Sequence, residues 1–196
     1  MDILILMPTE IGKQGMRKAL SKFETVNNYK VVQCGIGKVE SAISTTMELS
    51  ARKYDAVVLS GFCGSSGEKG STSGVAIPCK AVCYDFYHDG FDEDVDVEFT
   101  TLMGDEGVIL TGDQFVNENT AKLLKSKYKD SKVYFDMESS GVCQACSAFG
   151  KTPLVIKLVA DYPEDGDTIE DFRKFAETAD FVSIVGFLEN YFTDEI

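Results

Sequence analysis

Short apolar runs recur along the chain, and segments with helical spacing separate them. Several of these runs alternate poorly between apolar and polar side chains, which is typical of strands buried on both faces. Regular alternation of such strands with helices favours a largely parallel sheet. The predicted strands cover residues 2–7, 30–34, 55–61, 75–83, 107–111, 132–136 and 153–160.

The intervening segments are predicted to be helices. In the last one, apolar residues from Phe172 to Val185 recur at intervals of three and four, so one helix face should pack on the sheet. Thr168 is its candidate N-cap, and Gly150 ends the helix before it. We therefore expect one domain over residues 1–196, with the fold class α/β: a three-layer α/β/α sandwich around a central mixed, largely parallel sheet. The predicted helices cover residues 10–22, 38–53, 117–128, 138–149 and 168–192.

Composition and charge narrow the classes of partner. The chain has 196 residues, 44% of them hydrophobic, which is ordinary for a soluble globular protein. Its formal net charge of -13 disfavours nucleic-acid binding, because that draws its affinity from lysines and arginines on phosphates. It has no apolar stretch of about 18 residues and no N-terminal targeting pattern, so no membrane partner is expected.

The cysteines and the acidic stretch do not predict a metal site. Six cysteines lie mostly inside apolar runs, which suits reduced core thiols in a cytoplasmic protein. The pair Cys143 and Cys146 falls in a predicted helix without a second ligand pair. The acid-rich segment 85–106 is interpreted as a solvated loop or hairpin. His88 within it is interpreted as a surface or loop histidine, and a role beside a ligand is the alternative. We expect no metal and no cofactor.

Three segments at predicted strand ends could hold a small molecule. The turn 34–38, Cys-Gly-Ile-Gly-Lys, lets backbone amides approach a ligand, although such a turn is often only a tight connection. Strand 55–61 runs into the small residues Cys63 and Gly64, which leave room at the sheet edge. Phe115, after the strand 107–111, can stack on a flat heterocycle, although the pattern alone favours a core position.

Two carboxylates also stand at strand ends. Glu138 follows Met137 where a helix begins, and Asp161 ends the apolar run 153–160. A parallel sheet can hold both acids at one cleft, so they predict acid/base chemistry on a small molecule.

Taken in order, these segments resemble the nucleoside phosphorylase and nucleosidase superfamily, and most closely the 5'-methylthioadenosine/S-adenosylhomocysteine nucleosidases. The resemblance runs over nearly the whole chain. It rests on Glu10 after the first strand and on the segments CGIGKVESA, DAVVLSGFCG, VAIPCKAVCYD, YHDGF, LTGDQFVN, FDMESSGVCQAC and IKLVADYPEDGDTIEDF.

The resemblance implies hydrolysis of the N-glycosidic bond of an adenine nucleoside that carries a 5'-thio substituent, by a cytoplasmic homodimer. In that family pattern Asp161 protonates the purine N7, and Glu10 helps to hold and activate the attacking water. Phe115 stacks on adenine, and the backbone of Val116 contacts the purine edge.

The remaining implied contacts concern the ribose and the water. Met137 and Glu138 match the pair that contacts the ribose, with the Glu138 carboxylate on its hydroxyls. Lys157 stands where the nucleosidases usually carry an arginine near the water. Phe62, Cys63 and Gly64 would border the substrate. Phe62 stands where the family usually has a small residue, and Ala160 where it has a Ser or Thr.

The implied chemistry sets demands on two of these acids. Asp161 must be protonated when it donates, so we expect burial or a neighbouring carboxylate to raise its pKa. Glu10 must stay ionised, and a nearby Lys157 would help.

Two alternatives remain open. A phosphorylase of the same fold must bind phosphate, which the family does with arginines near the first strand and before the glycine turn. Here those places hold Pro8-Thr9 and Leu59-Ser60, so water is the favoured nucleophile. The other alternative is a nucleoside-binding or storage-type homologue without catalysis.

Overall fold

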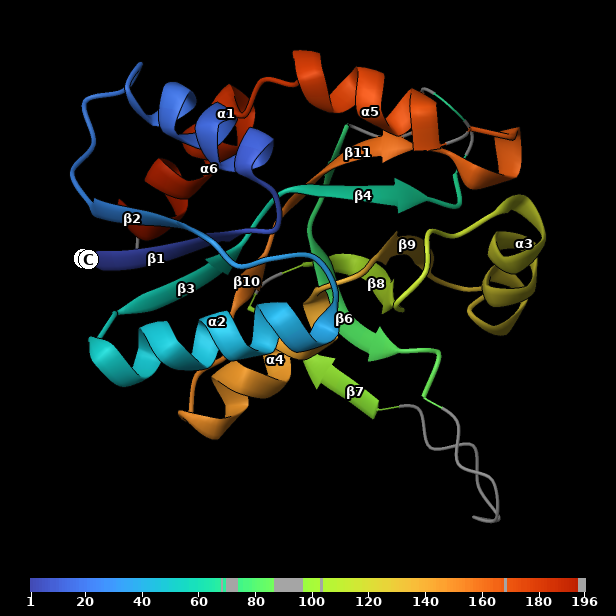
Figure 1. Cartoon of the computed structure of the whole chain (residues 1–196), viewed down its shortest axis with the longest axis horizontal. Coiled ribbons are helices and arrows are strands. Elements are labelled where there is room, and N and C mark those ends of the chain that lie inside the picture. Colours follow the sequence, from blue (N-terminus) through green and yellow to red (C-terminus); the bar gives the residue numbers. More distant parts are fainter. Residues whose placement is uncertain (68, 70–73, 87–96, 103, 168, 194–196) are drawn as a thin grey trace.

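The computed structural model in Figure 1 describes residues 1–67, 69, 74–86, 97–102, 104–167 and 169–193. Strands and helices alternate along most of the chain. The strands are β1 (Asp2–Met7), β2 (Asn28–Gln33), β3 (Ala56–Leu59), β4 (Phe62–Ser65), β5 (Val75–Ala76), β6 (Pro78–Cys83), β7 (Val97–Thr100), β8 (Asp105–Thr111), β9 (Lys132–Asp136), β10 (Leu154–Val155) and β11 (Lys157–Asp161). The helices are α1 (Glu10–Leu20), α2 (Lys38–Ala51), α3 (Glu118–Lys127), α4 (Ser139–Ala148), the 3-10 helix η1 (Pro163–Asp165), α5 (Ile169–Thr178) and α6 (Val182–Thr193).

The strands form two hydrogen-bonded sheets, and the chain passes from one sheet to the other at two places. The strand orders of the sheets are β10-β3-β1-β2 and β5-β11-β4-β9-β8-β6-β7. The chain passes from the first sheet to the second at Gly61, between β3 and β4, and again at Ile156, between β10 and β11. Gly61 has φ 127, a conformation that residues with a Cβ rarely adopt, and so allows the first crossing.

The predicted mixed, largely parallel sheet is confirmed. Pairs β4–β9, β5–β11 and β6–β7 are antiparallel, whereas the central pairs β1–β2, β1–β3, β6–β8, β8–β9 and β4–β11 are parallel. Parallel neighbours bring their carboxyl ends to one edge. Because β4 and β11 run opposite to β9 and β8, however, the ends of β9 and β11 meet on either side of Gly64 from opposite directions.

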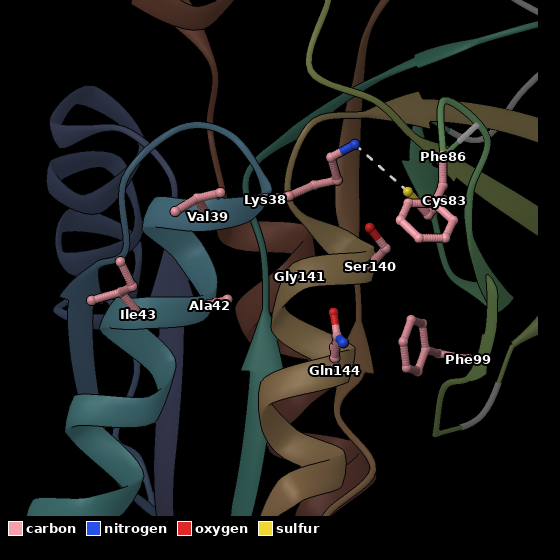
Figure 2. A pocket seen from close by; sticks show the side chains of 10 residues that line it. All are labelled: Lys38, Val39, Ala42, Ile43, Cys83, Phe86, Phe99, Ser140, Gly141 and Gln144. Carbon is pink, nitrogen blue, oxygen red and sulfur yellow. Dashed lines mark hydrogen bonds between the residues drawn. The ribbon is translucent and has the colours of Figure 1, made fainter. Parts of the chain in front are cut away.

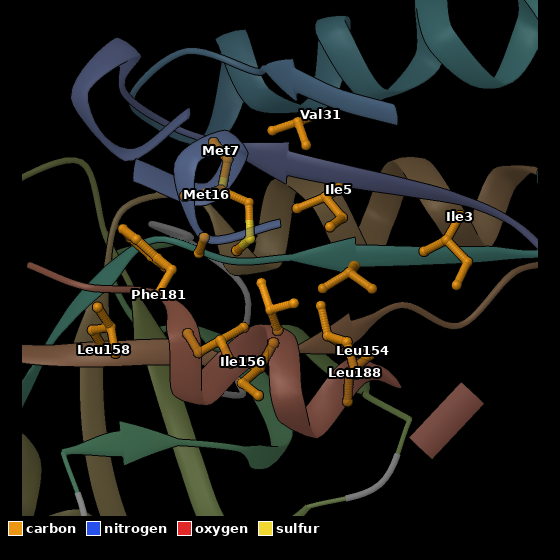
Figure 3. Packing of buried hydrophobic residues seen from close by; sticks show 14 of the residues in the cluster. Ile3, Ile5, Met7, Met16, Val31, Leu154, Ile156, Leu158, Phe181 and Leu188 are labelled. Atoms are coloured by element: carbon orange, nitrogen blue, oxygen red, sulfur yellow. The ribbon is translucent and has the colours of Figure 1, made fainter. Parts of the chain in front are cut away.

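Helices cover both faces of the strands. Figure 1 shows α1, α5 and α6 on one side and α2 and α4 on the other. Ile3, Ile5 and Met7 of β1 pack toward the first group, where Figure 3 shows them among Met16 and Leu188. The alternate residues of β1, Leu4 and Leu6, pack toward α2 and α4. The poor alternation of this run therefore reflects burial on both faces, as predicted.

The C-terminal helical segment differs from the prediction of one helix over 168–192. It forms α5 and α6, and the break falls at Ala179–Phe181. The Asp180 carboxylate accepts a hydrogen bond from the Val182 amide at 3.0 Å, which starts a new helix instead of continuing the old one. The expected N-cap Thr168, and His88 with most of the acidic segment around it, lie outside the described residues.

The cysteines are free, as the sequence predicted, and Cys143 and Cys146 are buried in α4. Within the described residues, no helix combines the length and the hydropathy needed to cross a membrane.

Candidate active site

A cavity of about 400 Å³ opens where β9 and β11 both end, on either side of β4. β4, β9 and β11 contribute directly, and the segments that follow β1, β2 and β8 close its sides. It is lined by Pro8, Thr9, Ile36, Phe62, Cys63, Gly64, Phe115, Phe135, Asp136, Met137, Glu138, Asp161, Ile169 and Phe172. Most of the residues that the sequence analysis singled out are thus brought together.

Asp161 is the buried acid of this cavity. It ends β11, its exposed fraction is 4%, and it pairs in register with Gly64 of β4. Within the part of the chain that the structure describes, no group hydrogen-bonds its carboxyl. Burial, and after it the negative charge of Asp167, raise the pKa of Asp161 to about 7. An acid in this state can donate a proton near neutral pH.

A small recess lies beside Asp161. Phe115, in the segment between β8 and α3, is 37% exposed, so it is not the core residue that the pattern alone favoured. Val116 is buried and helps to line an adjoining recess of about 40 Å³, together with Gly64, Phe115 and Asp161. An aromatic face and a protonated acid therefore meet in one place, which suits a basic heterocycle.

Aromatic packing explains the position of Phe62. Its ring lies 5.6 Å from that of Phe172, 6.2 Å from Phe175 and 5.5 Å from Phe181, measured between centroids. Phe172 in turn makes an edge contact with Phe115 at 6.0 Å. The helix α5 thus joins the wall of the cavity through Phe172, which the sequence analysis had placed only on the packing face of a helix.

Glu138 is the second buried acid of the cavity. It sits at the junction of β9 and α4, where it precedes the first residue of the helix, and it is 5% exposed. Its Oε1 accepts a hydrogen bond from the Gly37 amide at 3.2 Å, and its Oε2 contacts Lys157 Nζ at 3.1 Å. The glycine turn therefore brings a backbone amide to a site carboxylate, where the sequence analysis had expected an approach to a ligand.

Lys157 and Glu10 do not line the cavity. Thr9 is the N-cap of α1, so Glu10 is the first residue of that helix. The Glu10 carboxylate lies on the exposed side of the helix, where Lys13 Nζ is 2.7 Å away. Lys157 is fully buried and pairs with Asp136 at 2.5 Å as well as with Glu138. The structure therefore does not bring Lys157 to Glu10. The helix cap directs Glu10 outward, whereas the sheet encloses Lys157.

Asp136 was not among the predicted site residues, although it lies directly before the Met137-Glu138 pair. Asp136 lines the cavity and holds the buried lysine. The sequence does show a third acid at the end of β9. The hydrophobic pattern, however, indicates only that this acid is the last residue of a strand.

A second cavity of about 400 Å³ lies between α2, α4 and β6. Figure 2 shows Lys38 and Cys83 at its rim, with Lys38 Nζ 3.6 Å from the sulfur. The same ammonium group pairs with Asp85, and with Asp113 at 3.3 Å. Lys38 thus ties the glycine turn to the segment that carries Phe115.

Comparison with known proteins shows what the chain is similar to. Residues 104–180 match the family model described as the phosphorylase superfamily. The 5'-methylthioadenosine/S-adenosylhomocysteine nucleosidase of Buchnera aphidicola subsp. Acyrthosiphon pisum (strain APS) is 29% identical over 187 residues, which cover 84% of this chain and 78% of that protein. Residues 104–180 of the chain are thus similar to the phosphorylase superfamily, and most of its length is similar to a nucleosidase.

Solved structures of nucleosidases have the same fold as this chain. A mutant of Helicobacter pylori MTAN with 5'-methylthioadenosine in its active site has a TM-score of 0.79 at 22% identity, over 100% of this chain and 99% of that one. The Streptococcus pneumoniae MTA/SAH nucleosidase in complex with 8-aminoadenine has a TM-score of 0.72 at 23% identity, over 90% and 92%.

The described lining of the cavity carries no cationic side chain. No arginine or lysine occurs among the described residues that line it. Arg17 instead donates to the Val31 carbonyl at 3.2 Å, and Arg52 pairs with Asp2 at 2.8 Å, both away from the cavity. The site therefore suits a neutral ligand better than a phosphate anion.

Proposed function

We propose that this chain hydrolyses the N-glycosidic bond of an adenine nucleoside with a 5'-thio substituent and releases adenine and the thioribose. The observation that carries the proposal is Asp161, a buried carboxyl with a pKa raised to about 7 that faces the recess beside Phe115. Relatives named 5'-methylthioadenosine/S-adenosylhomocysteine nucleosidases support the substrate class.

The base is held by the recess in this proposal. Phe115 stacks on adenine, and the backbone of Val116 meets the purine edge. Asp161 then donates its proton to N7, so adenine leaves as a neutral molecule. Gly64 leaves the acid room, and Cys63 and Phe62 form the adjoining wall.

The ribose is held on the other side of the cavity. Met137 packs on the sugar, and Glu138 accepts hydrogen bonds from its hydroxyls. As the bond to the base breaks, positive charge develops on the ribose. Glu138 is buried beside it, and a carboxylate in such a site stabilises that charge more than it would in water. The role of Glu10 at the water stays a prediction from the resemblance, since its carboxylate contacts Lys13 and Gln14.

The direct test is incubation with 5'-methylthioadenosine, followed by chromatography of the products. We expect adenine to form at the same rate with and without inorganic phosphate. Dependence on phosphate would instead make the chain a phosphorylase. If no purine nucleoside yields a free base under either condition, the chain is a binding or storage-type protein and the proposal fails.

A variant test addresses the acid. Asp161→Asn keeps the shape of the side chain but cannot donate the proton, so we expect kcat to fall by about 100-fold or more while adenine still binds. Asp180→Asn is the control, because Asp180 is an exposed acid that pairs with Lys22. Normal turnover by Asp161→Asn would remove Asp161 from this role.

A second copy of the chain is the proposed partner. α2 and the turn before it carry apolar side chains at intervals of three and four, and each is more than half exposed: Ile36 54%, Val39 68%, Ile43 56% and Met47 67%. A solvated helix rarely has such a stripe without a partner. Ile36 also lines the substrate cavity, so a second copy on this stripe would border the substrate.

Light scattering after gel filtration tests this dimer. We expect twice the chain mass of 21.5 kDa for the wild type. Met47→Glu should give the monomer, whereas Leu123→Glu should not, because Leu123 is similarly exposed but lies on α3. A monomeric wild type contradicts the proposal.

A cytoplasmic location is proposed from the thiols. All six cysteines are free, and free thiols persist in reducing compartments.

A further inference from the structure

The starting point is a lysine with no access to solvent. The Lys157 side chain has an exposed fraction of 0%, and its Nζ lies 2.5 Å from Asp136 Oδ2 and 3.1 Å from Glu138 Oε2. Lys157 begins β11, whereas the two acids flank Met137 at the end of β9. Since β4 lies between these two strands, the lysine links the strand of Asp161 to the strand end of Glu138 across a third strand.

Asp136 is fixed from several sides. Its Oδ1 accepts a hydrogen bond from Thr111 Oγ1 at 2.8 Å. Its Oδ2 accepts from the Ser139 amide at 3.0 Å and from Ser139 Oγ at 2.6 Å, in addition to Lys157. The four protein donors leave Asp136 little capacity for a substrate hydroxyl, although it borders the cavity.

The Glu138 carboxylate can accept further hydrogen bonds. From the described part of the chain, each of its oxygens accepts one hydrogen bond, from Gly37 at 3.2 Å and from Lys157 at 3.1 Å. A carboxylate oxygen can accept two, so one position on each oxygen remains for a pair of neighbouring hydroxyls. The ribose 2' and 3' hydroxyls are such a pair.

The next feature is the balance of charge among Lys157, Asp136 and Glu138. Burial alone would lower the pKa of Lys157, but the charges of Asp136 and Glu138 outweigh it and keep the ammonium form. Burial raises the pKa of Glu138, and Lys157 opposes that effect. Asp136 is the nearer partner of Lys157 Nζ, at 2.5 Å against 3.1 Å for Glu138, so Glu138 contacts the lysine and still borders the cavity.

We propose that Asp136 and Lys157 are a positioning pair that fixes the Glu138 carboxylate for two ribose hydroxyls, so that this chain distinguishes a nucleoside from its free base through Glu138. The inference rests on the proposed function and adds two residues to it. Lys157 takes a different place from the one that the resemblance implied, since it acts through Glu138 and not on the water.

The test compares a ligand that has a ribose with one that lacks it. With 5'-methylthioadenosine as substrate, we expect Asp136→Asn to raise KM at least 10-fold and to lower kcat. The dissociation constant for adenine, measured by calorimetry, should stay within about 3-fold. Lys157→Met should act in the same way, and Lys157→Arg should restore part of the effect because it keeps the charge. Glu48→Gln is the control, since this acid pairs with Lys30 on the outer side of α2.

Loss of one charge from a buried pair can prevent folding. The double variant Asp136→Asn with Lys157→Met removes both charges, and we expect it to fold, to bind adenine normally and to bind the nucleoside poorly. If the wild type turns over 5'-methylthioadenosine and the single or double variants keep the wild-type ratio of nucleoside to adenine affinity, the positioning pair is wrong and the proposed function stands. If the wild type yields no adenine at all, the proposed function itself fails.

Discussion

Gly64 and Asp161 face each other on β4 and β11 so closely that a Cβ atom on Gly64 would lie 2.9 Å from Asp161 Oδ2. That atom ends a side chain, so the carboxyl can move aside while the backbone stays. We expect Gly64→Ala to lower kcat at least 10-fold, because a small misplacement of a catalytic group is costly, and to change the melting temperature little. Steady-state kinetics and thermal unfolding check this.

The matched control for that variant is Gly186→Ala in α6. The nearest atom to a Cβ there is 3.9 Å away, which is ordinary contact. Alanine should stabilise this helix by up to about 1 kcal/mol and leave kcat unchanged. Equal loss of activity in both variants would contradict the special closeness of Gly64 and Asp161.

The stability of Asp161→Asn should depend on pH. In the folded protein the pKa of Asp161 is about 7, against an ordinary value of 3.8, so folding favours the protonated form. Below about pH 4 this pKa difference does not lower the free energy of unfolding of the wild type, and the loss of free energy grows as the pH rises to about 7. Asparagine is never charged, so at pH 8 the variant should be more stable than the wild type by up to roughly 4 kcal/mol.

Urea unfolding of both proteins at pH 5 and pH 8 measures this difference. The variant's advantage should be larger at pH 8. An advantage that is the same at both pH values would show that Asp161 does not titrate between them.

The pH profile of kcat/KM should respond to Asp167. Its negative charge is the second cause of the raised pKa of Asp161, after burial. Asp167→Asn should therefore lower that pKa, so the loss of activity at alkaline pH begins at a lower pH than in the wild type. A profile that does not move would assign the shift to burial alone.

Phe115→Ala should weaken adenine binding between about 5-fold and 100-fold, since stacking of a base on an aromatic ring contributes about 1–3 kcal/mol. Titration calorimetry with adenine measures the dissociation constant. Phe86→Ala is the control, because Phe86 is also exposed but lines the second cavity. Equal affinities for wild type and Phe115→Ala would place the base elsewhere.

Glu10→Gln separates the family pattern from the geometry. The Glu10 carboxylate is exposed and bonded to Lys13 at 2.7 Å, so the structure predicts kcat and KM within about 2-fold of the wild type. The measurement is steady-state kinetics with 5'-methylthioadenosine. A loss of 100-fold or more would mean that the first turn of α1 moves toward the cavity when substrate binds.

Local pattern was sufficient for most of the fold. The ranges of β1 and β9 match their predictions, and α1, α2, α3 and α4 differ by about one or two residues at their ends. Prediction failed where a distant contact decides the outcome. Residues 153–160 were predicted as one strand, but they form β10 in the first sheet and β11 in the second, because their neighbours change along their length. The strand predicted over 55–61 is β3, and β4, which follows it in the other sheet, was not predicted.

Residue type and position along the chain determined the candidate chemistry of this protein: an acid at the end of one buried strand, another at the start of a helix, and a phenylalanine after a third. These features are local, since hydrophobic patterning predicts where strands end. Tertiary structure alone decided which of them meet. It buried Lys157 against Asp136, turned Glu10 outward at a helix cap, and added Phe172 from α5 to the wall, because the direction of a side chain depends on register, capping and packing partners that lie far away in the sequence.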